Sequence, residues 1–84
     1  MDIEFDPNKD EANIAKHGVS LVRTADLEIL AVMRDARFTS EMRFRAFGLI
    51  DGAPHCLAFT MRGALVRAIS LRRAHAKEMR RYLP

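Results

Sequence analysis

"MRFRAFGLIDGAPHCLAFTMRGALVRAISL", residues 42–71, is the stretch that decides the fold. Apolar and polar side chains alternate along much of it, and two segments with the composition of tight turns, residues 51–54 and 62–63, interrupt it. Alternation with a period of two indicates strands, and short turns join antiparallel neighbours. We therefore expect three consecutive antiparallel strands: residues 42–50, 55–61 and 64–71.

Two helices are expected before these strands. An Asp-Pro pair and a later glycine have the composition of a helix start and a helix end, which predicts a helix over residues 7–17. A second helix is expected to start at Ser20 or Thr24, either of which is suited to cap it, and to run to about residue 30.

The complete predicted order is β-α-α-β-β-β(-β)-α, an α+β fold with a compact antiparallel sheet flanked by helices. Its first strand is residues 3–6 and its last helix residues 75–83, whereas residues 31–41 are ambiguous between strand and loop. Helices should cover one face of the sheet and leave the other face or its rim open. The covered face is expected to bury Ile3, Phe5, Phe44, Leu57, Phe59 and Ile69. We expect residues 1–84 to form a single domain.

The sequence also indicates a compartment. Residues 1–14 carry acidic side chains and no apolar segment of the kind that signal peptides contain. No stretch approaches the roughly 18 continuous apolar residues that a membrane span needs. Cys56 is the only cysteine, so no disulfide is expected within the chain. These features predict a cytoplasmic protein that does not enter a membrane.

The charges are distributed unevenly along the chain. Residues 1–51 hold 7 lysines and arginines against 10 acidic residues, a net charge of −3, whereas residues 52–84 hold 7 against Glu78 alone, a net charge of +6. A basic half of this kind suggests a polyanion or an acidic protein as the partner. The alternative is a basic face that water simply solvates.

Common signatures of catalytic and metal sites are absent from the sequence. It holds no glycine-rich phosphate loop, no nucleophile elbow and no helical histidine pair at metal-binding spacing. His17, His55 and His75 lie far apart, without a cysteine or aspartate at ligand spacing. We therefore expect no metal and no cofactor, and Cys56 fits a small core residue better than a nucleophile.

Arginine is the residue type that remains for chemistry. Arg43 and Arg45 share one side of a predicted strand, Arg67 interrupts an apolar run, and Arg72 and Arg73 follow its end. Guanidinium groups bind phosphate through paired hydrogen bonds and stabilise charge on a transferring phosphoryl group. In the structural alternative, Arg67 pairs with an acid, and Arg72 and Arg73 only decorate the exposed start of the last helix. The candidate acids for Arg67 are Asp51, Glu41 and Glu28.

Four further polar residues have two interpretations each. His17 is either a general acid or base, for which an ordinary pKa of about 6.5 is suited, or a helix-capping residue. Lys9 and Lys16 either hold phosphate or are simply solvated. Tyr82 either stacks on a base or packs against the protein.

Three blocks resemble the BrnT family of toxins from bacterial type II toxin–antitoxin modules. "FDPNKDEANIAKHGVSL", residues 5–21, is similar to the opening signature of that family, which runs from aromatic-Asp-Pro to Lys-His-Gly-Val. "EMRFRAFG", residues 41–48, resembles its Glu-x-Arg-Phe-x-x-x-Gly strand. "VRAISLRRAHAKEMRRY", residues 66–82, resembles its Arg-x-Ile-Ser-x-Arg-Arg-Ala segment and the basic helix that follows. The family often has tryptophan in place of Phe5, and residues 31–40 follow no family pattern.

The resemblance implies a RelE-like fold and a ribonuclease that cleaves RNA and arrests translation and growth. It also implies a cognate BrnA-like antitoxin that neutralises the toxin. That antitoxin carries a DNA-binding domain, so the complex represses its own operon and reaches operator DNA only through the antitoxin. A toxin dimer within the complex is implied as well.

For the site, our hypothesis is a metal-independent endoribonuclease in which the ribose 2′-hydroxyl attacks the adjacent phosphate. Arg67 and Arg72 are expected to stabilise the phosphoryl charge, and His17 or Lys16 to assist proton transfer. The expected RNA-binding residues are Lys9, Arg43, Arg73 and Tyr82. The alternative function is a basic module that binds nucleic acid or a partner without cleavage, such as an inactive toxin that serves as a co-repressor.

Overall fold

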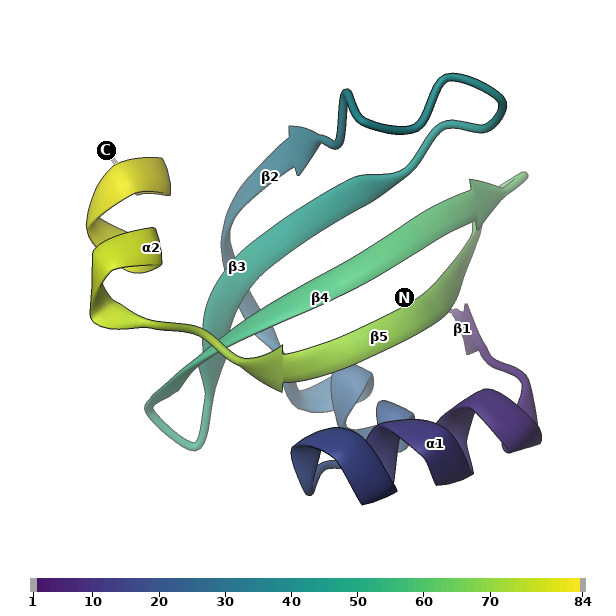
Figure 1. Ribbon diagram of the computed structural model, residues 1–84, viewed down its shortest axis with the longest axis horizontal. Coiled ribbons are helices and arrows are strands. Elements are labelled where there is room, and N and C mark those ends of the chain that lie inside the picture. Colours follow the sequence, from purple (N-terminus) through teal and green to yellow (C-terminus); the bar gives the residue numbers. More distant parts are fainter. Residues whose placement is uncertain (1, 84) are drawn as a thin grey trace.

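A five-stranded sheet lies at the centre of the computed structural model, which describes residues 2–83 (Figure 1). Its strands are β1 (Ile3–Glu4), β2 (Glu28–Arg34), β3 (Phe44–Ile50), β4 (Ala53–Arg62) and β5 (Leu65–Arg73). They lie in the order β1-β5-β4-β3-β2, and every neighbouring pair is antiparallel except β1 with β5. The α+β class is confirmed, and β2 precedes the three consecutive strands that the sequence predicts.

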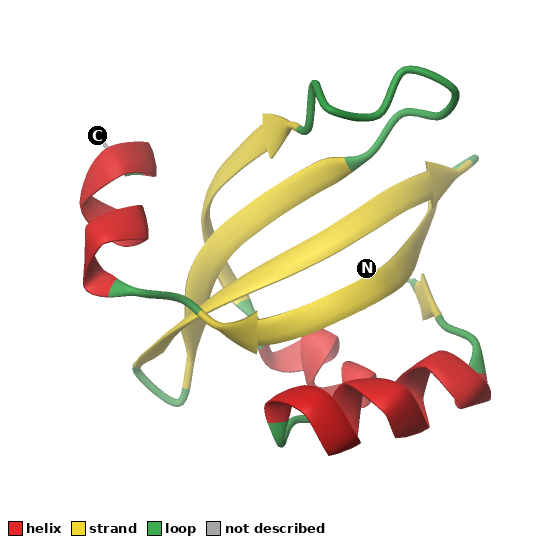
Figure 2. Ribbon diagram, viewed as in Figure 1, coloured by secondary structure: helices red, strands yellow, loops and turns green. Residues whose placement is uncertain are grey.

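Helical segments flank this sheet (Figure 2): α1 (Pro7–His17), the 3₁₀ helix η1 (Leu21–Asp26) and α2 (Ala76–Tyr82). Both α1 and η1 pack on β5, whereas α2 follows the end of β5 and lies apart from α1 (Figure 1). Among residues 2–83, no helix has the length and apolar character needed to cross a membrane.

The first helix has the predicted start and end. The Asp6 carboxylate accepts a hydrogen bond of 2.8 Å from the backbone N–H of Asn8, and Pro7 opens the helix. Gly18 ends it with a φ of 74°, a left-handed conformation that favours glycine, and its N–H donates to the carbonyl of Ile14 at 2.8 Å. Local capping chemistry therefore sets both ends of α1.

The second predicted helix is shorter than expected. Ser20 caps it, as one of the two alternatives predicted, but the segment is a 3₁₀ helix that ends at Asp26. Residues 28–34 instead form β2, because this stretch, rich in β-branched and apolar side chains, pairs with β3. The ambiguous residues 31–41 are accordingly divided between the end of β2 and a loop.

The first tight turn is shorter than its predicted segment, and the second is shifted by one residue, to residues 63–64. Asp51 and Gly52 have φ values of 51° and 77° and join β3 to β4, with Ile50 opposite Ala53. The next turn contains Gly63, with a φ of 60°, so Arg62 belongs to β4 and not to the turn. Two-residue turns of this kind fix the register of the strands and hence which side chains share a face.

The main core lies between the sheet and the α1–η1 side. Its buried members are Leu21, Leu27, Ala46, Ile50, Leu57, Phe59, Val66, Ala68 and Leu71. Ile3, Phe5 and Phe44 pack against it while only partly buried. The prediction for Ile69 was wrong: the β4–β5 register shifts beside it, so Ile69 is unpaired and lines surface hollows instead.

A smaller core forms where α2 meets the sheet. Phe47, Cys56 and Ala74 are buried there, and Met33, Met79 and Tyr82 pack against them. Cys56 is 3 % exposed and burial raises the pKa of its thiol, in agreement with a structural role.

Candidate nucleic-acid interface

Adjoining hollows form one basic groove along β5. The first, of about 460 Å³, is lined by Lys9, Arg43 and Arg67. A smaller hollow between α1 and β5 shares Lys9 with it and continues to Lys16 and His17. A further hollow, of about 420 Å³, is lined by Lys16, His17, Arg72, Arg73, His75 and Glu78. Neighbouring hollows share Lys9, Lys16 and His17, so they adjoin one another between Arg67 and Arg72.

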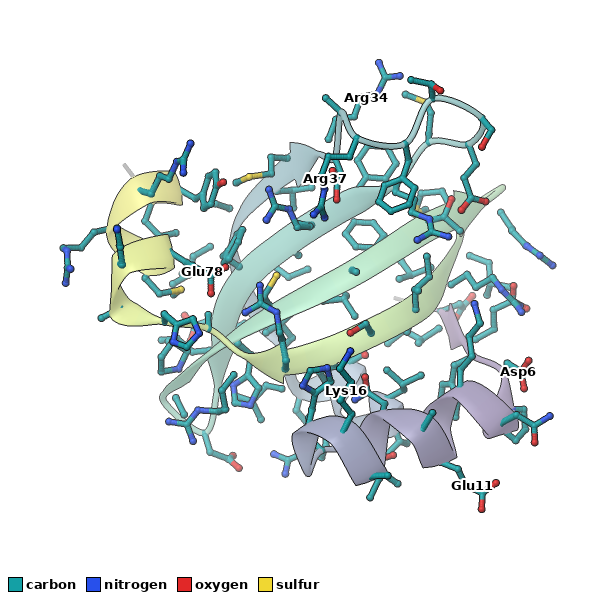
Figure 3. The ribbon with its side chains drawn as sticks, in the orientation of Figure 1. Asp6, Glu11, Lys16, Arg34, Arg37 and Glu78 are labelled. Carbon is teal, nitrogen blue, oxygen red and sulfur yellow. The ribbon has the colours of Figure 1, made fainter. Side chains whose placement is uncertain are left out.

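The groove owes its shape to the way α1 is fastened to β5. Asn13, 5 % exposed, donates from Nδ2 to the carbonyls of Val19 and Leu71 at 2.8 Å each, and its Oδ1 accepts from the Leu71 N–H at 3.1 Å. Figure 3 shows Lys16 on the side of α1 nearer the sheet and Glu11 on the outer side. One buried amide therefore holds the cations of α1 opposite those of β5.

Arg67 has an acidic partner that the sequence does not suggest. Its Nη1 lies 3.2 Å from Oε1 of Glu4, because β1 pairs with β5 in a register that places Glu4 beside Arg67. The predicted candidates Asp51, Glu41 and Glu28 are therefore wrong as partners. The Arg67 side chain keeps 24 % exposure and still lines the first hollow.

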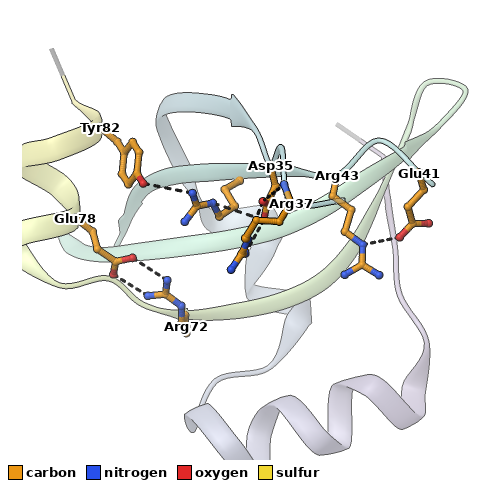
Figure 4. Close-up of polar contacts among 8 residues, drawn as sticks. Asp35, Arg37, Glu41, Arg43, Arg72, Glu78 and Tyr82 are labelled. Atoms are coloured by element: carbon orange, nitrogen blue, oxygen red, sulfur yellow. Dashed lines mark hydrogen bonds and ion pairs between the residues drawn. The ribbon is translucent and has the colours of Figure 1, made fainter. Parts of the chain in front are cut away.

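Arg72 is held more tightly than Arg67. Its Nη1 and Nη2 donate to Oε1 and Oε2 of Glu78 at 2.8 Å each (Figure 4). Nη1 also donates to the carbonyl of Arg73 at 3.1 Å. Glu78 Oε1 additionally accepts the His75 N–H at 3.0 Å. The hydrogen bonds from Arg72 lower the pKa of Glu78 to about 2. The other edge of the Arg72 guanidinium, formed by the N–H of Nε and the second N–H of Nη2, has no partner among residues 2–83.

His17 lies in the same hollow with a lowered pKa. Partial burial of the imidazole is the main cause, and the nearby cations Lys16 and Arg72 add to it. The ring is therefore predominantly neutral near pH 7, the state in which an imidazole accepts a proton.

Two residues beside the groove, Asp35 and Arg37, were missed by sequence reasoning. Asp35, 5 % exposed, accepts from Nε and Nη2 of Arg37 at 2.9 and 2.6 Å, and these bonds lower its pKa to about 2. Nε of Arg45 lies 3.9 Å from the same carboxylate. Asp35 and Arg37 belong to a segment without family resemblance, and the only signal was their Asp-x-Arg spacing after a strand.

Tyr82 and Arg43 complete the predicted set. The Tyr82 ring stacks on Phe47 with centroids 4.9 Å apart, and Nη2 of Arg45 donates to its hydroxyl at 3.4 Å. Tyr82 therefore packs beside the smaller core and lines none of the groove hollows named above. The guanidinium of Arg43 pairs with Glu41 and lies 4.1 Å above the Phe38 ring.

The predicted residues thus fall into two groups and one outlier. Lys9, Arg43 and Arg67 line the first hollow, and Lys16, His17, Arg72 and Arg73 line the last, while a further hollow of about 260 Å³ is lined by both Arg43 and Arg72. Among residues 2–83, no three histidine, cysteine or acidic side chains are grouped so that they could hold a metal ion. The described residues thus form a small α+β protein with a basic surface groove and a neutral histidine at one end of it.

Comparison with known proteins agrees with this class. Residues 5–78 match the family described as the ribonuclease toxin, BrnT, of type II toxin–antitoxin systems. The fold matches the crystal structure of the Brucella abortus ribonuclease toxin, BrnT, with a TM-score of 0.67 and 30 % sequence identity, covering 89 % of this chain and 97 % of that chain. No curated protein matches the sequence. The chain therefore belongs to the BrnT family, as its sequence blocks predict, whereas the RelE-like label stays a prediction.

Proposed function

We propose that this chain is a metal-independent endoribonuclease that cleaves RNA in the cytoplasm, inhibits translation and so arrests growth. Membership of a ribonuclease toxin family supports the class of reaction. One observation carries the assignment to the groove: a hollow of about 420 Å³ brings together Lys16, His17, Arg72 and Arg73. A neutral imidazole that can accept a proton and cations that bind phosphate are groups that RNA cleavage can use.

RNA lies along the groove in this proposal. Arg72 contacts the reacting phosphate through its unpaired Nε–Nη2 edge, because Glu78 holds the opposite edge. Arg67 is five residues away along β5, about 16 Å for an extended strand, and therefore contacts another phosphate of the same strand. Lys9, Arg43 and Arg73 contact the remaining backbone, and Tyr82, which lies outside the groove, contacts a nucleotide that extends beyond it.

The chemistry is an internal transfer of the phosphoryl group. The ribose 2′-oxygen attacks phosphorus while its proton passes to the neutral imidazole of His17. Arg72 stabilises the charge that develops on the non-bridging oxygens. The P–O5′ bond breaks, the leaving oxygen takes a proton from the Lys16 ammonium, and the products are a 2′,3′-cyclic phosphate and a 5′-hydroxyl.

The partners follow from the toxin–antitoxin class. Membership of a type II family implies an antitoxin. In our proposal this antitoxin is BrnA-like, neutralises the toxin and carries the DNA-binding domain through which the complex represses its operon. The complex holds a toxin dimer, and the net charge of +6 on residues 52–84 suits an acidic antitoxin segment.

A specific observation favours one second function. Both Arg67 and Arg72 already have carboxylate partners, Glu4 and Glu78, which offset their positive charge. An inactive toxin that binds partners as a co-repressor would also have such paired arginines. The two functions differ in whether RNA is cut.

Cleavage of an RNA oligonucleotide by the purified chain, with a chelator present, tests the proposal. The expected products carry 2′,3′-cyclic phosphate and 5′-hydroxyl ends. His17→Gln and Arg72→Ala should each slow cleavage by about a hundredfold. Arg80→Ala, in the exposed part of α2, is the matched control and should cleave normally. Full activity of both groove variants contradicts the assignment, and binding without product supports the co-repressor.

A further inference from the structure

The outer edge of β2 is the most exposed apolar element of the sheet. β2 stands last in the strand order, so its outer edge pairs with no strand of residues 2–83. Val32 is 52 % exposed, Leu30 44 % and Ile29 37 %. The groove along β5 does not use these residues, and β2 lies at the other end of the strand order from it.

Edge strands of stable monomers are commonly protected by inward-pointing charges, prolines or a covering element. The interior of β2, Ile29 to Met33, has neither charge nor proline. Its only charges are Glu28 at the start and Arg34 at the end, and among residues 2–83 neither forms an ion pair. Figure 3 shows Arg34 on the outside of the molecule. An open apolar edge of this kind invites another strand.

The sequence of β2 is complementary to itself. In an antiparallel pair of two copies centred on Ala31, Leu30 lies opposite Val32 of the second copy, and Glu28 lies opposite Arg34. The two most exposed apolar residues of the strand thus meet, and opposite charges meet at both ends of the pair. A pair centred on Val32 would place Glu28 opposite Ala36 and leave both charges without a partner.

We infer that two copies of this chain associate through β2, antiparallel and centred on Ala31, so that their sheets join into one. The inference rests on the toxin dimer proposed above, for which it names the interface, and it does not depend on RNA cleavage. The grooves of both copies remain open, because β5 and α1 lie away from the joined edge. One strand pair buries little surface, so the dimer is weak and depends on concentration.

Charge reversal tests the register. In Glu28→Arg, like charges face each other at both ends of the pair, and the same holds for Arg34→Glu. Sedimentation velocity of the wild-type chain should show a monomer–dimer equilibrium, and each variant should dimerise about tenfold more weakly. An equimolar mixture of the two variants restores both opposite-charge pairs, and should dimerise about as well as wild type. Wild-type protein that stays monomeric at every concentration, or a mixture that does not recover, overturns the inference.

Two valine substitutions distinguish pairing through the β2 edge from nonspecific hydrophobic association. Val32→Lys removes an exposed apolar contact of β2 and should abolish the dimer. Val22→Lys is the matched control, because Val22 is 59 % exposed on η1, outside the edge. Both variants should keep the wild-type circular dichroism, since both side chains are exposed. Equal dimerisation of the Val32→Lys variant and wild type also overturns the inference.

Discussion

Arg72 is oriented by Glu78 before any RNA arrives. Two hydrogen bonds of 2.8 Å fix the plane of the guanidinium. The same carboxylate accepts the backbone N–H of His75, the residue that precedes α2. The position of Arg72 is thereby linked to the start of α2. The sequence suggests arginine as the reactive residue type but not this partner, because a contact between a strand end and the helix after it depends on the turn between them.

Loss of the Glu78 charge should impair cleavage without loss of the fold. Glu78→Gln keeps the shape of the side chain but weakens the hold on Arg72, and we expect the rate of cleavage to fall by about tenfold with little change in RNA affinity. Glu11→Gln, on the outer side of α1, is the control and should behave as wild type (Figure 3). An unchanged rate in the Glu78 variant would show that the pair is only structural.

Acid should unfold the protein through two carboxyl groups. The pKa of Asp35 falls from 3.8 to about 2 on folding, and that of Glu78 from 4.5 to about 2. Between these values the unfolded state binds more protons, so the stability from both groups is present above pH 4.5 and is lost as the pH falls toward 2. Urea unfolding at successive pH values measures this loss. In Asp35→Asn, the free energy of unfolding should fall less steeply as the pH is lowered. An unchanged pH dependence would contradict the role of Asp35.

At the scale of elements, Asn13 joins the two halves of the groove. Asn13→Ala would leave the buried N–H and C=O of Leu71 without these partners, at a cost of about 3 kcal/mol in the free energy of unfolding. Asn8→Ala, in the exposed first turn of the same helix, is the control and should cost far less. Urea denaturation of the two variants measures the difference, and equal stabilities would contradict the account of Asn13.

The elements that were predicted correctly are those with local signals. The start and end of α1 depend on Asp6 and Gly18, and the three later strands depend on alternation and on turns that contain glycine. The second helix was predicted too long because β2 is defined by its pairing with β3, which no local pattern of Ile29 or Leu30 reveals. The bulge at Ile69 likewise arises only between paired strands.

At the scale of the whole molecule, the fold gathers cations from distant parts of the chain. Lys9 and Lys16 come from α1, and Arg67 and Arg72 from β5, so the groove is basic although residues 1–51 carry a net charge of −3. The sequence predicts both sets of cations. It does not reveal that Arg67 and Arg72 line separate hollows or that Tyr82 lies outside the groove, because both depend on the three-dimensional course of β5 and α2.

Binding of RNA to the groove should depend strongly on salt. Each lysine or arginine that neutralises a phosphate of single-stranded RNA contributes about 0.7 to the slope of log affinity against log salt concentration. Arg73→Gln should therefore reduce the slope by about 0.7, since exposed Arg73 lines the groove. Arg80→Gln, on α2, is the control of equal charge and should leave the slope near that of wild type. Equal slopes for both variants would show that Arg73 does not contact RNA.

The central claim is that the groove cuts RNA, and its most direct test is the mapping of RNA 5′ ends in cells after brief induction of this chain. Cells that induce His17→Gln serve as the control. We predict new, recurrent 5′-hydroxyl ends together with growth arrest for the wild-type chain, and neither for the variant. A folded wild-type protein that produces no new ends would contradict the proposed ribonuclease and favour the co-repressor.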